Sequence, residues 1–114
     1  MSDQDVLMRS NAGMRLIALA TIYNKGDFTR LRAYMKEHFT PSALETAPIA
    51  LRLAELREQF RTTGKVRVRQ VVTHDKHRVV AILSGEHGGN FIEDIAVEEE
   101  YPHKVSAHSR QQLL

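Results

Sequence analysis

The fold is decided by the last third of the chain, where four runs read VRVRQVVT at residues 66–73, RVVAILS at 78–84, NFIEDIAV at 90–97 and KVSAHSR at 104–110. Each run is short and rich in β-branched side chains. The connections between them are polar and contain Asp, Gly and Pro. These features predict four antiparallel strands in one sheet.

The residues before Val66 carry apolar side chains at helical spacing. The spacing predicts three helices, over Asp3–Tyr23, over Phe28–His38, and from Pro48 to Gly64. The clearest apolar stripe lies on the third of these and consists of Ile49, Leu53, Leu56 and Phe60. We therefore expect an α+β domain over residues 1–114, with three N-terminal helices packed on a four-stranded antiparallel sheet.

Composition argues against several function classes. The 114 residues include no cysteine, so disulfides, thiol nucleophiles and cysteine-bound zinc are excluded. The net charge is only +2 and aromatic residues make up 6% of the chain, which argues against nucleic-acid binding. The six histidines show no ligand spacing on one element, so we expect no metal and no cofactor.

Nothing in the sequence indicates a membrane or an export route. No run approaches the ~18 apolar residues that a membrane span needs. The first residues are acidic and polar, without the basic start and apolar segment of a signal peptide. We therefore expect a cytoplasmic protein.

Three motifs suggest a family: Tyr-Asn-Lys-Gly-Asp at 23–27, His-Phe-Thr-Pro-Ser-Ala-Leu at 38–44 and Glu-Tyr-Pro-His-Lys-Val at 100–105. On these residues the chain resembles the nuclear transport factor 2-like superfamily, and within it the accessory modules fused to some bacterial serine hydrolases. The resemblance implies a curved sheet wrapped around helices into a cone, often with an internal pocket and often dimeric. No Gly-x-Ser-x-Gly motif is present, so this chain lacks the elbow of a serine hydrolase.

Turn lengths predict the register of the sheet. A two-residue turn at Asp75-Lys76 and a four-residue loop at 86–89 would place Leu83 opposite both Val68 and Ile92. Both faces of the sheet are then largely apolar and need a cover, and a one-residue slip would exchange them. We expect one face to meet the helices and line a pocket, through Tyr23, Tyr34, Gln70, Leu83 and Ile92. We expect the other face to form a homodimer interface, through Arg67, Arg69, Val80, Ile82, Phe91, Glu93 and Ile95.

The third predicted strand carries two carboxylates, Asp94 and Glu93, that are candidate functional groups. Asp94 lies between Ile92 and Ala96, and pairing Val97 with Val105 would set it opposite His108. A partly buried carboxylate beside an imidazole can act as a general acid or base, or can simply satisfy two polar groups. Glu93 faces the other way, where a cross-sheet or inter-subunit salt bridge is the plainer interpretation.

The sequence favours a non-catalytic module that binds a small ligand or serves as an accessory or dimerisation domain. The expected partners are a second copy of the chain and a small apolar molecule, without nucleic acid or membrane. The alternative is an enzyme of the ketosteroid isomerase or polyketide cyclase type, which the family resemblance also implies. In that enzyme Asp94 and His108 would transfer protons.

Overall fold

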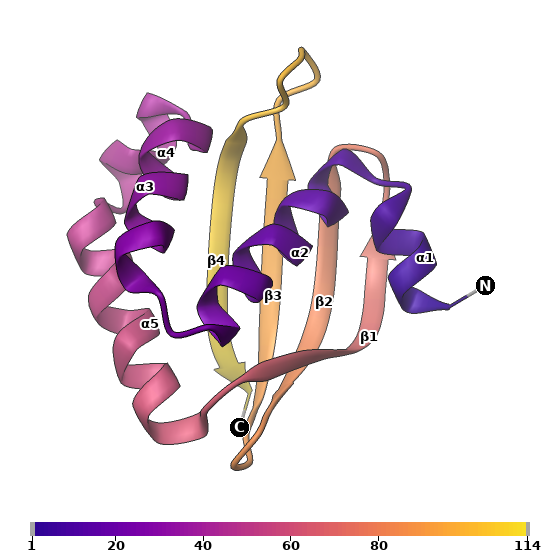
Figure 1. The fold of residues 1–114 in the computed structure, drawn as a ribbon. Helices are drawn as coiled ribbons and strands as arrows, with labels where there is room; N and C mark the ends of the chain where they lie inside the picture. Colours follow the sequence, from indigo (N-terminus) through magenta and orange to yellow (C-terminus); the bar gives the residue numbers. More distant parts are fainter. Residues whose placement is uncertain (1, 114) are drawn as a thin grey trace.

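The computed structural model describes residues 2–113 and contains five helices followed by four strands, all shown in Figure 1. The helices are α1 (Asp3–Met8), α2 (Asn11–Asn24), α3 (Phe28–His38), α4 (Pro41–Thr46) and α5 (Ile49–Thr63). The strands are β1 (Val66–His74), β2 (Arg78–Gly85), β3 (Asn90–Val97) and β4 (Val105–Leu113). They form an antiparallel meander in the order β1-β2-β3-β4, so the predicted α+β class is confirmed.

Two local features raise the number of helices from three to five. Ser10 ends the first helix and caps the next one, because its hydroxyl accepts from the Gly13 amide at 3.1 Å and donates to the Asp75 carbonyl at 2.8 Å. Gly13 is needed there, since a Cβ atom would lie 2.2 Å from the carbonyl oxygen of Leu7. The segment between the second and third predicted helices contains the short helix α4, which Thr40 caps.

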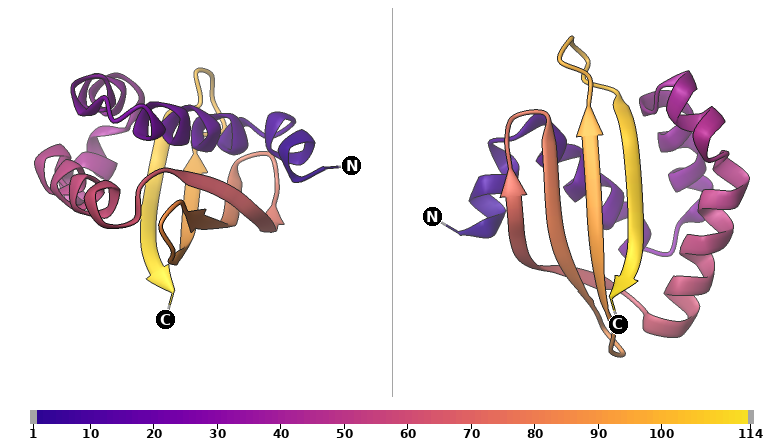
Figure 2. Two further views of the ribbon diagram at one scale, coloured as in Figure 1. Left: turned by 60° about the horizontal axis from the view of Figure 1, so that its bottom comes forward. Right: turned by 180° about the vertical axis from the view of Figure 1, so that it is seen from behind.

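The helices cover one face of the sheet and extend past its β4 edge, and the opposite face is uncovered (Figures 1 and 2). Helix α2 crosses β2 and β3, α1 packs against β1, and the α3–α5 segment lies beyond the edge strand β4. The view from behind shows no helix on the other face of the sheet (Figure 2, right). The sheet is not strongly curled, so the expected cone of strongly curved strands is not seen.

The face that meets the helices carries the buried side chains of the sheet. On β2 these are Val79, Ala81 and Leu83, all 0% exposed. On β3 they are the odd-numbered residues, Phe91, Glu93, Ile95 and Val97. They join helix residues such as Leu16, Leu19, Leu31, Met35 and Leu53 in one hydrophobic core.

The predicted register is wrong by one residue between β2 and β3. Leu83 pairs with Phe91 and Ala81 with Glu93, because the connection runs over Gly85–Gly89 and Ser84 pairs with Asn90. Between β1 and β2 the predicted Val68–Leu83 pair is present, although two irregularities follow it. A single residue of slip exchanges the two faces of a strand.

The slip relocates several predicted interface residues. Phe91, Glu93 and Ile95 lie under the helices of the same chain, so they are not available to a second subunit through the open face. The open face instead carries Ile82 and Ile92 at its centre, with their cross-strand neighbours Gln70 and Gln111. Val80, Arg67 and Arg69 stay on this open side.

No helix within residues 2–113 has the length and apolar character to cross a membrane.

Candidate functional site

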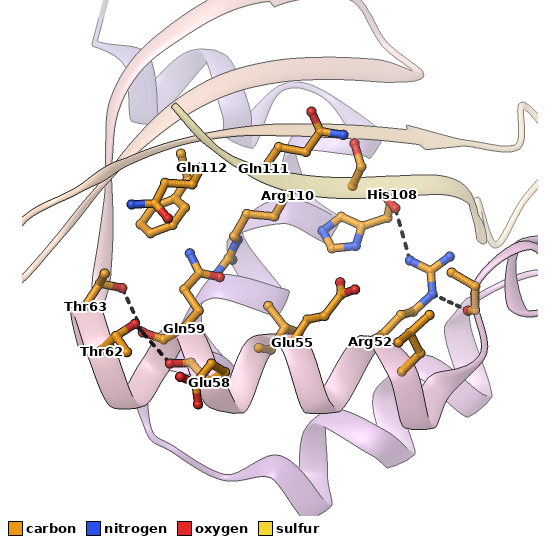
Figure 3. Close-up of a pocket in the computed structure, with 15 residues that line it drawn as sticks. Arg52, Glu55, Glu58, Gln59, Thr62, Thr63, His108, Arg110, Gln111 and Gln112 are labelled. Carbon is orange, nitrogen blue, oxygen red and sulfur yellow. Dashed lines mark hydrogen bonds between the residues drawn. The ribbon is translucent and has the colours of Figure 1, made fainter. Parts of the chain in front are cut away.

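A groove of about 780 Å³ lies between helix α5 and the edge strand β4. We call it the α5–β4 groove. Its volume is within the range of pockets that hold small molecules, about 300–1,000 Å³. Figure 3 shows side chains from both elements lining it, most of them polar or charged. They include Arg52, Glu55, Gln59, His108 and Arg110.

A fully buried carboxylate lies beneath this groove. Oε1 of Glu93 is 2.7 Å from Nε2 of His108, which donates because a carboxylate can only accept. Nη2 of Arg110 donates to both Glu93 oxygens, at 3.2 and 3.3 Å. The side chain of Glu93 is 0% exposed, that of His108 6% and that of Arg110 4%. We call these three residues the Glu93 network.

The Glu93 network keeps its carboxylate ionised. Burial by itself raises the pKa of Glu93, since a carboxylate loses its hydration in the interior. The positive charge of Arg110 and the hydrogen bond from His108 lower that pKa and outweigh burial, so the net shift is downward. Arg110 also lies over the ring of Tyr23, with its Cζ atom 4.6 Å from the ring centroid.

Arg52 joins the elements at one end of the α5–β4 groove. Its guanidinium donates to the main-chain oxygens of Ala43, Ala47 and His108, at 2.9, 2.6 and 3.1 Å. Figure 3 shows the bond to His108 crossing from helix to strand. Arg52 is buried, at 8% exposed. It therefore fixes the spacing between α4, α5 and β4.

Two N–H groups of this groove have no acceptor among the described residues. They are Nε2 of Gln59 and Nε of Arg110, and both atoms are buried. The two side chains are adjacent, because Nη1 of Arg110 donates to Oε1 of Gln59 at 3.4 Å. Buried donors are satisfied in most proteins, so this pair is an unusual feature of the groove.

The predicted contact between Asp94 and His108 is wrong. Val97 does pair with Val105 as predicted, but an irregularity at Ala96/Val97 shifts the following pairs, so Asp94 lies opposite Ser109. Its carboxylate is on the open face, 38% exposed, and accepts from Arg78 at 3.1 and 2.7 Å. His108, a predicted site residue, lines the groove, and its carboxylate partner is Glu93. The plainer interpretation of Glu93 as a salt-bridge residue fits, with different partners from those expected.

The predicted pocket residues do not gather in one place. The hydroxyl of Tyr23 donates to the Gly64 carbonyl at 3.0 Å, inside the core. Tyr34 accepts from Arg15 at 3.0 Å, on the side of the β3–β4 connection. Leu83 is buried under α2, whereas Gln70 and Ile92 lie on the open face. None of these five residues lines the α5–β4 groove.

Sequence reasoning missed Arg110, Arg52 and Gln59 as site residues. A signal for Glu93 was present in the run NFIEDIAV, where Phe91, Ile95 and Val97 alternate and Glu93 occupies the same face. A carboxylate in a buried row needs a partner, and the neighbouring strand offers His108 and Arg110 two residues apart.

A second hollow of about 300 Å³ lies between α1, α2 and β1 and is bordered by apolar side chains such as Leu16, Ile17 and Val68. Within residues 2–113 no group of three or more His, Cys, Asp or Glu side chains is arranged to hold a metal ion. Comparison with protein-family models, with curated proteins and with solved structures finds no match for this chain.

Proposed function

We propose that the chain is a non-catalytic binding module that holds a small molecule in the α5–β4 groove. The observation that carries the proposal is a ligand-sized groove with two buried N–H donors that the protein leaves without an acceptor. A bound molecule would supply that acceptor, and an unmet buried donor is costly. The lining combines polar side chains such as Arg52 and Glu55 with apolar ones such as Leu51 and Phe91, so we propose a small molecule that carries polar groups.

We also propose that the chain is a nuclear transport factor 2-like domain. The order of helices followed by a four-stranded meander agrees with that expectation, and the motifs at 23–27, 38–44 and 100–105 add to it. Homodimerisation through the open face of the sheet belongs to the same proposal. Its support is the pair Ile82 and Ile92, which are partly exposed on the face over which no helix packs; the neighbouring Val80 is already buried in the single chain.

An enzyme that transfers protons is the second candidate, and one observation favours it. His108 borders the α5–β4 groove, and Glu93 holds its Nε2 atom, which leaves Nδ1 as the basic nitrogen of the neutral ring. A buried carboxylate that orients an imidazole is a common arrangement for a general base. In this version Glu93 takes the role that the sequence suggested for Asp94.

A thermal-shift screen with a library of polar small molecules tests the main proposal. A molecule that binds only the native state raises the unfolding midpoint. Gln112→Trp should fill one end of the groove and abolish the shift, because Gln112 is an exposed lining residue. Met14→Trp is the control, because Met14 is 58% exposed on α2 and does not line the groove, and this variant should keep the shift. Equal loss in both variants, or no stabilising molecule at all, would overturn the proposal.

The same molecules separate the two candidates. Each stabilising compound is incubated with the protein in D₂O and followed by proton NMR. The binding module returns the compound unchanged. A proton-transfer enzyme would exchange or convert it, and His108→Gln would stop that reaction.

A further inference from the structure

The two donors without an acceptor have a fixed direction in the α5–β4 groove. Nη2 of Arg110 is held by Glu93 and Nη1 by Oε1 of Gln59, so Nε is the one nitrogen of the guanidinium that makes no hydrogen bond among the described residues. The same contact orients the Gln59 amide, because turning it over would set its NH₂ group against Nη1 of Arg110. In Figure 3 the nitrogen of Gln59 points toward Gln112 and strand β4. Both nitrogens are buried, so a ligand oxygen would meet these N–H groups where it reaches into the buried end of the groove.

Glu55 on α5 and His108 on β4 offer hydrogen-bond acceptors beside the two donors. Glu55 is four residues before Gln59 on α5, so the two side chains share a helix face with Cβ atoms about 5–6 Å apart. His108 is two residues before Arg110 on β4, and both side chains contact Glu93. Nε2–H of His108 is used by Glu93, so Nδ1 is an acceptor whenever the ring carries one proton. Figure 3 shows the Glu55 carboxylate directed toward His108.

The donor pair of Gln59 and Arg110 and the acceptor pair of Glu55 and His108 therefore lie one after the other along the groove, since one turn of α5 separates Glu55 from Gln59. A ligand that bonds to both pairs needs an acceptor and a donor close to each other. A carboxamide has this arrangement, with its C=O beside its N–H. A ketone lacks the donor, and an amine lacks the acceptor.

The charges lining the groove favour an uncharged ligand. Arg52 and Arg110 are balanced by Glu55 and by Glu93 beneath them. Glu58, which also lines the groove, is paired with Arg61. A carboxylate ligand would approach Glu55, and an ammonium ligand would approach the free N–H groups, so each would meet repulsion at one end.

We infer that the α5–β4 groove takes a small uncharged molecule with an amide group of the carboxamide or lactam class. Its carbonyl oxygen accepts from Nε2 of Gln59 and Nε of Arg110, and its N–H donates toward Glu55 and Nδ1 of His108. The inference rests on the proposed function, since it names the ligand class of the same groove.

Side-chain NMR of the ¹⁵N-labelled protein tests this inference. The probes are 2-pyrrolidinone, a lactam; N-methyl-2-pyrrolidinone, which lacks the N–H; pyrrolidine, which is cationic and lacks the acceptor; and cyclopentanecarboxylate, which is anionic. Gln59→Met and Arg110→Lys assign the Gln59 NH₂ and Arg110 Nε–H signals. The Nε–H of Arg78, which donates to Asp94 on the open face, is the internal control.

We expect 2-pyrrolidinone to move the Gln59 and Arg110 signals saturably and to leave the Arg78 signal in place. Loss of one neutral hydrogen bond should weaken binding about 2- to 10-fold, both in Gln59→Met and with N-methyl-2-pyrrolidinone. Gln70→Met is the control variant and should bind as the unmodified chain does. Pyrrolidine should move neither signal.

Other outcomes would overturn the inference in recognisable ways. Stronger binding of cyclopentanecarboxylate would make the groove an anion site. Molecules that perturb Leu51 or Ser109 in the groove, but not the Gln59 and Arg110 side chains, would leave the proposed binding function and remove the amide class. If no library compound and no probe perturbs the groove, both the proposed binding function and the amide ligand class are wrong.

Discussion

At the residue scale, Glu93 is the side chain on which the interior of this protein depends most. It is ionised, fully buried and held by Arg110 and His108, with a pKa lowered by those two partners against the effect of burial. Burying a charge is costly, and removing one partner from a buried pair leaves the other uncompensated. Asp94, its neighbour in sequence, forms an exposed pair with Arg78 and lacks this role.

Glu93→Gln should therefore destabilise the protein by about 3–5 kcal/mol, because Arg110 would remain buried without its counter-charge. Urea denaturation followed by circular dichroism measures the change. Asp94→Asn is the matched control, and an exposed ion pair contributes only about 0–1 kcal/mol. Equal losses in the two variants would contradict the role assigned to Glu93.

The same residue predicts how stability depends on pH. Glu93 has a lower pKa in the folded chain than in the unfolded chain, where the usual value is about 4.3. Below that value the unfolded chain binds the proton first, so the stabilising contribution is present above about pH 4.3 and is lost as the pH falls toward the folded pKa. The unfolding free energy of Glu93→Gln, measured across this acidic range, should fall less steeply than that of the unmodified chain. Parallel curves would rule out Glu93 as the source.

At the element scale, helix α5 connects the core to the groove. Its predicted apolar stripe is confirmed, with Leu53 2% and Leu56 8% exposed. Phe60 belongs to the same stripe, but its ring packs against two other aromatic rings. It meets Tyr23 and Phe28 edge-on, with ring centroids 5.3 and 5.8 Å away. One side of α5 therefore packs into the core while another lines the α5–β4 groove.

Leu53→Ala should cost about 2–5 kcal/mol of unfolding free energy, because it leaves a cavity between α5 and its neighbours. Leu51 is two residues away on the same helix and is 52% exposed. Leu51→Ala should change stability by no more than about 0.5 kcal/mol. Chemical denaturation of both variants measures the difference, and a small loss in Leu53→Ala would show that this stripe is not the buried one.

The sequence predicted the elements better than their pairing. Strand positions follow from β-branched runs, and the predicted strands agree closely with β1 to β4. Register depends on one residue at each turn, and neither the extra loop residue at Gly85 nor the irregularity beside Val97 has a strong sequence signal. For this reason His108 was predicted beside a carboxylate, but beside Asp94 rather than Glu93. Contacts between α5 and β4, such as Arg110 with Gln59, depend on tertiary packing and were not predictable from periodicity.

At the scale of the whole molecule, one layer of helices covers one face of the sheet. The extents of 37 × 35 × 24 Å describe a flattened body, consistent with two layers. The open face carries Val80, Ile82 and Ile92 in adjacent strands, with Arg67 and Arg69 on the same side. An apolar centre surrounded by charged residues is the usual composition of a protein interface.

We expect light scattering at micromolar concentration to give about twice the chain mass of 13.0 kDa. Ile82→Asp should reduce the mass to that of one chain, since it places a charge at the centre of the contact. Met14→Asp is the control, because Met14 is 58% exposed on α2, which lies on the opposite side of the sheet. A monomeric unmodified protein would contradict dimerisation.

The central claim is that the α5–β4 groove, rather than the open face or the second hollow, holds the ligand. Methyl NMR with a library of polar small molecules tests it most directly. Stabilising compounds should shift the methyl signals of Leu51 and Leu56, which line the groove. Signals of Ile17 and Val68 in the second hollow and of Ile82 on the open face should stay in place. Shifts confined to Ile17 and Val68, or to Ile82, would contradict ligand binding in the α5–β4 groove.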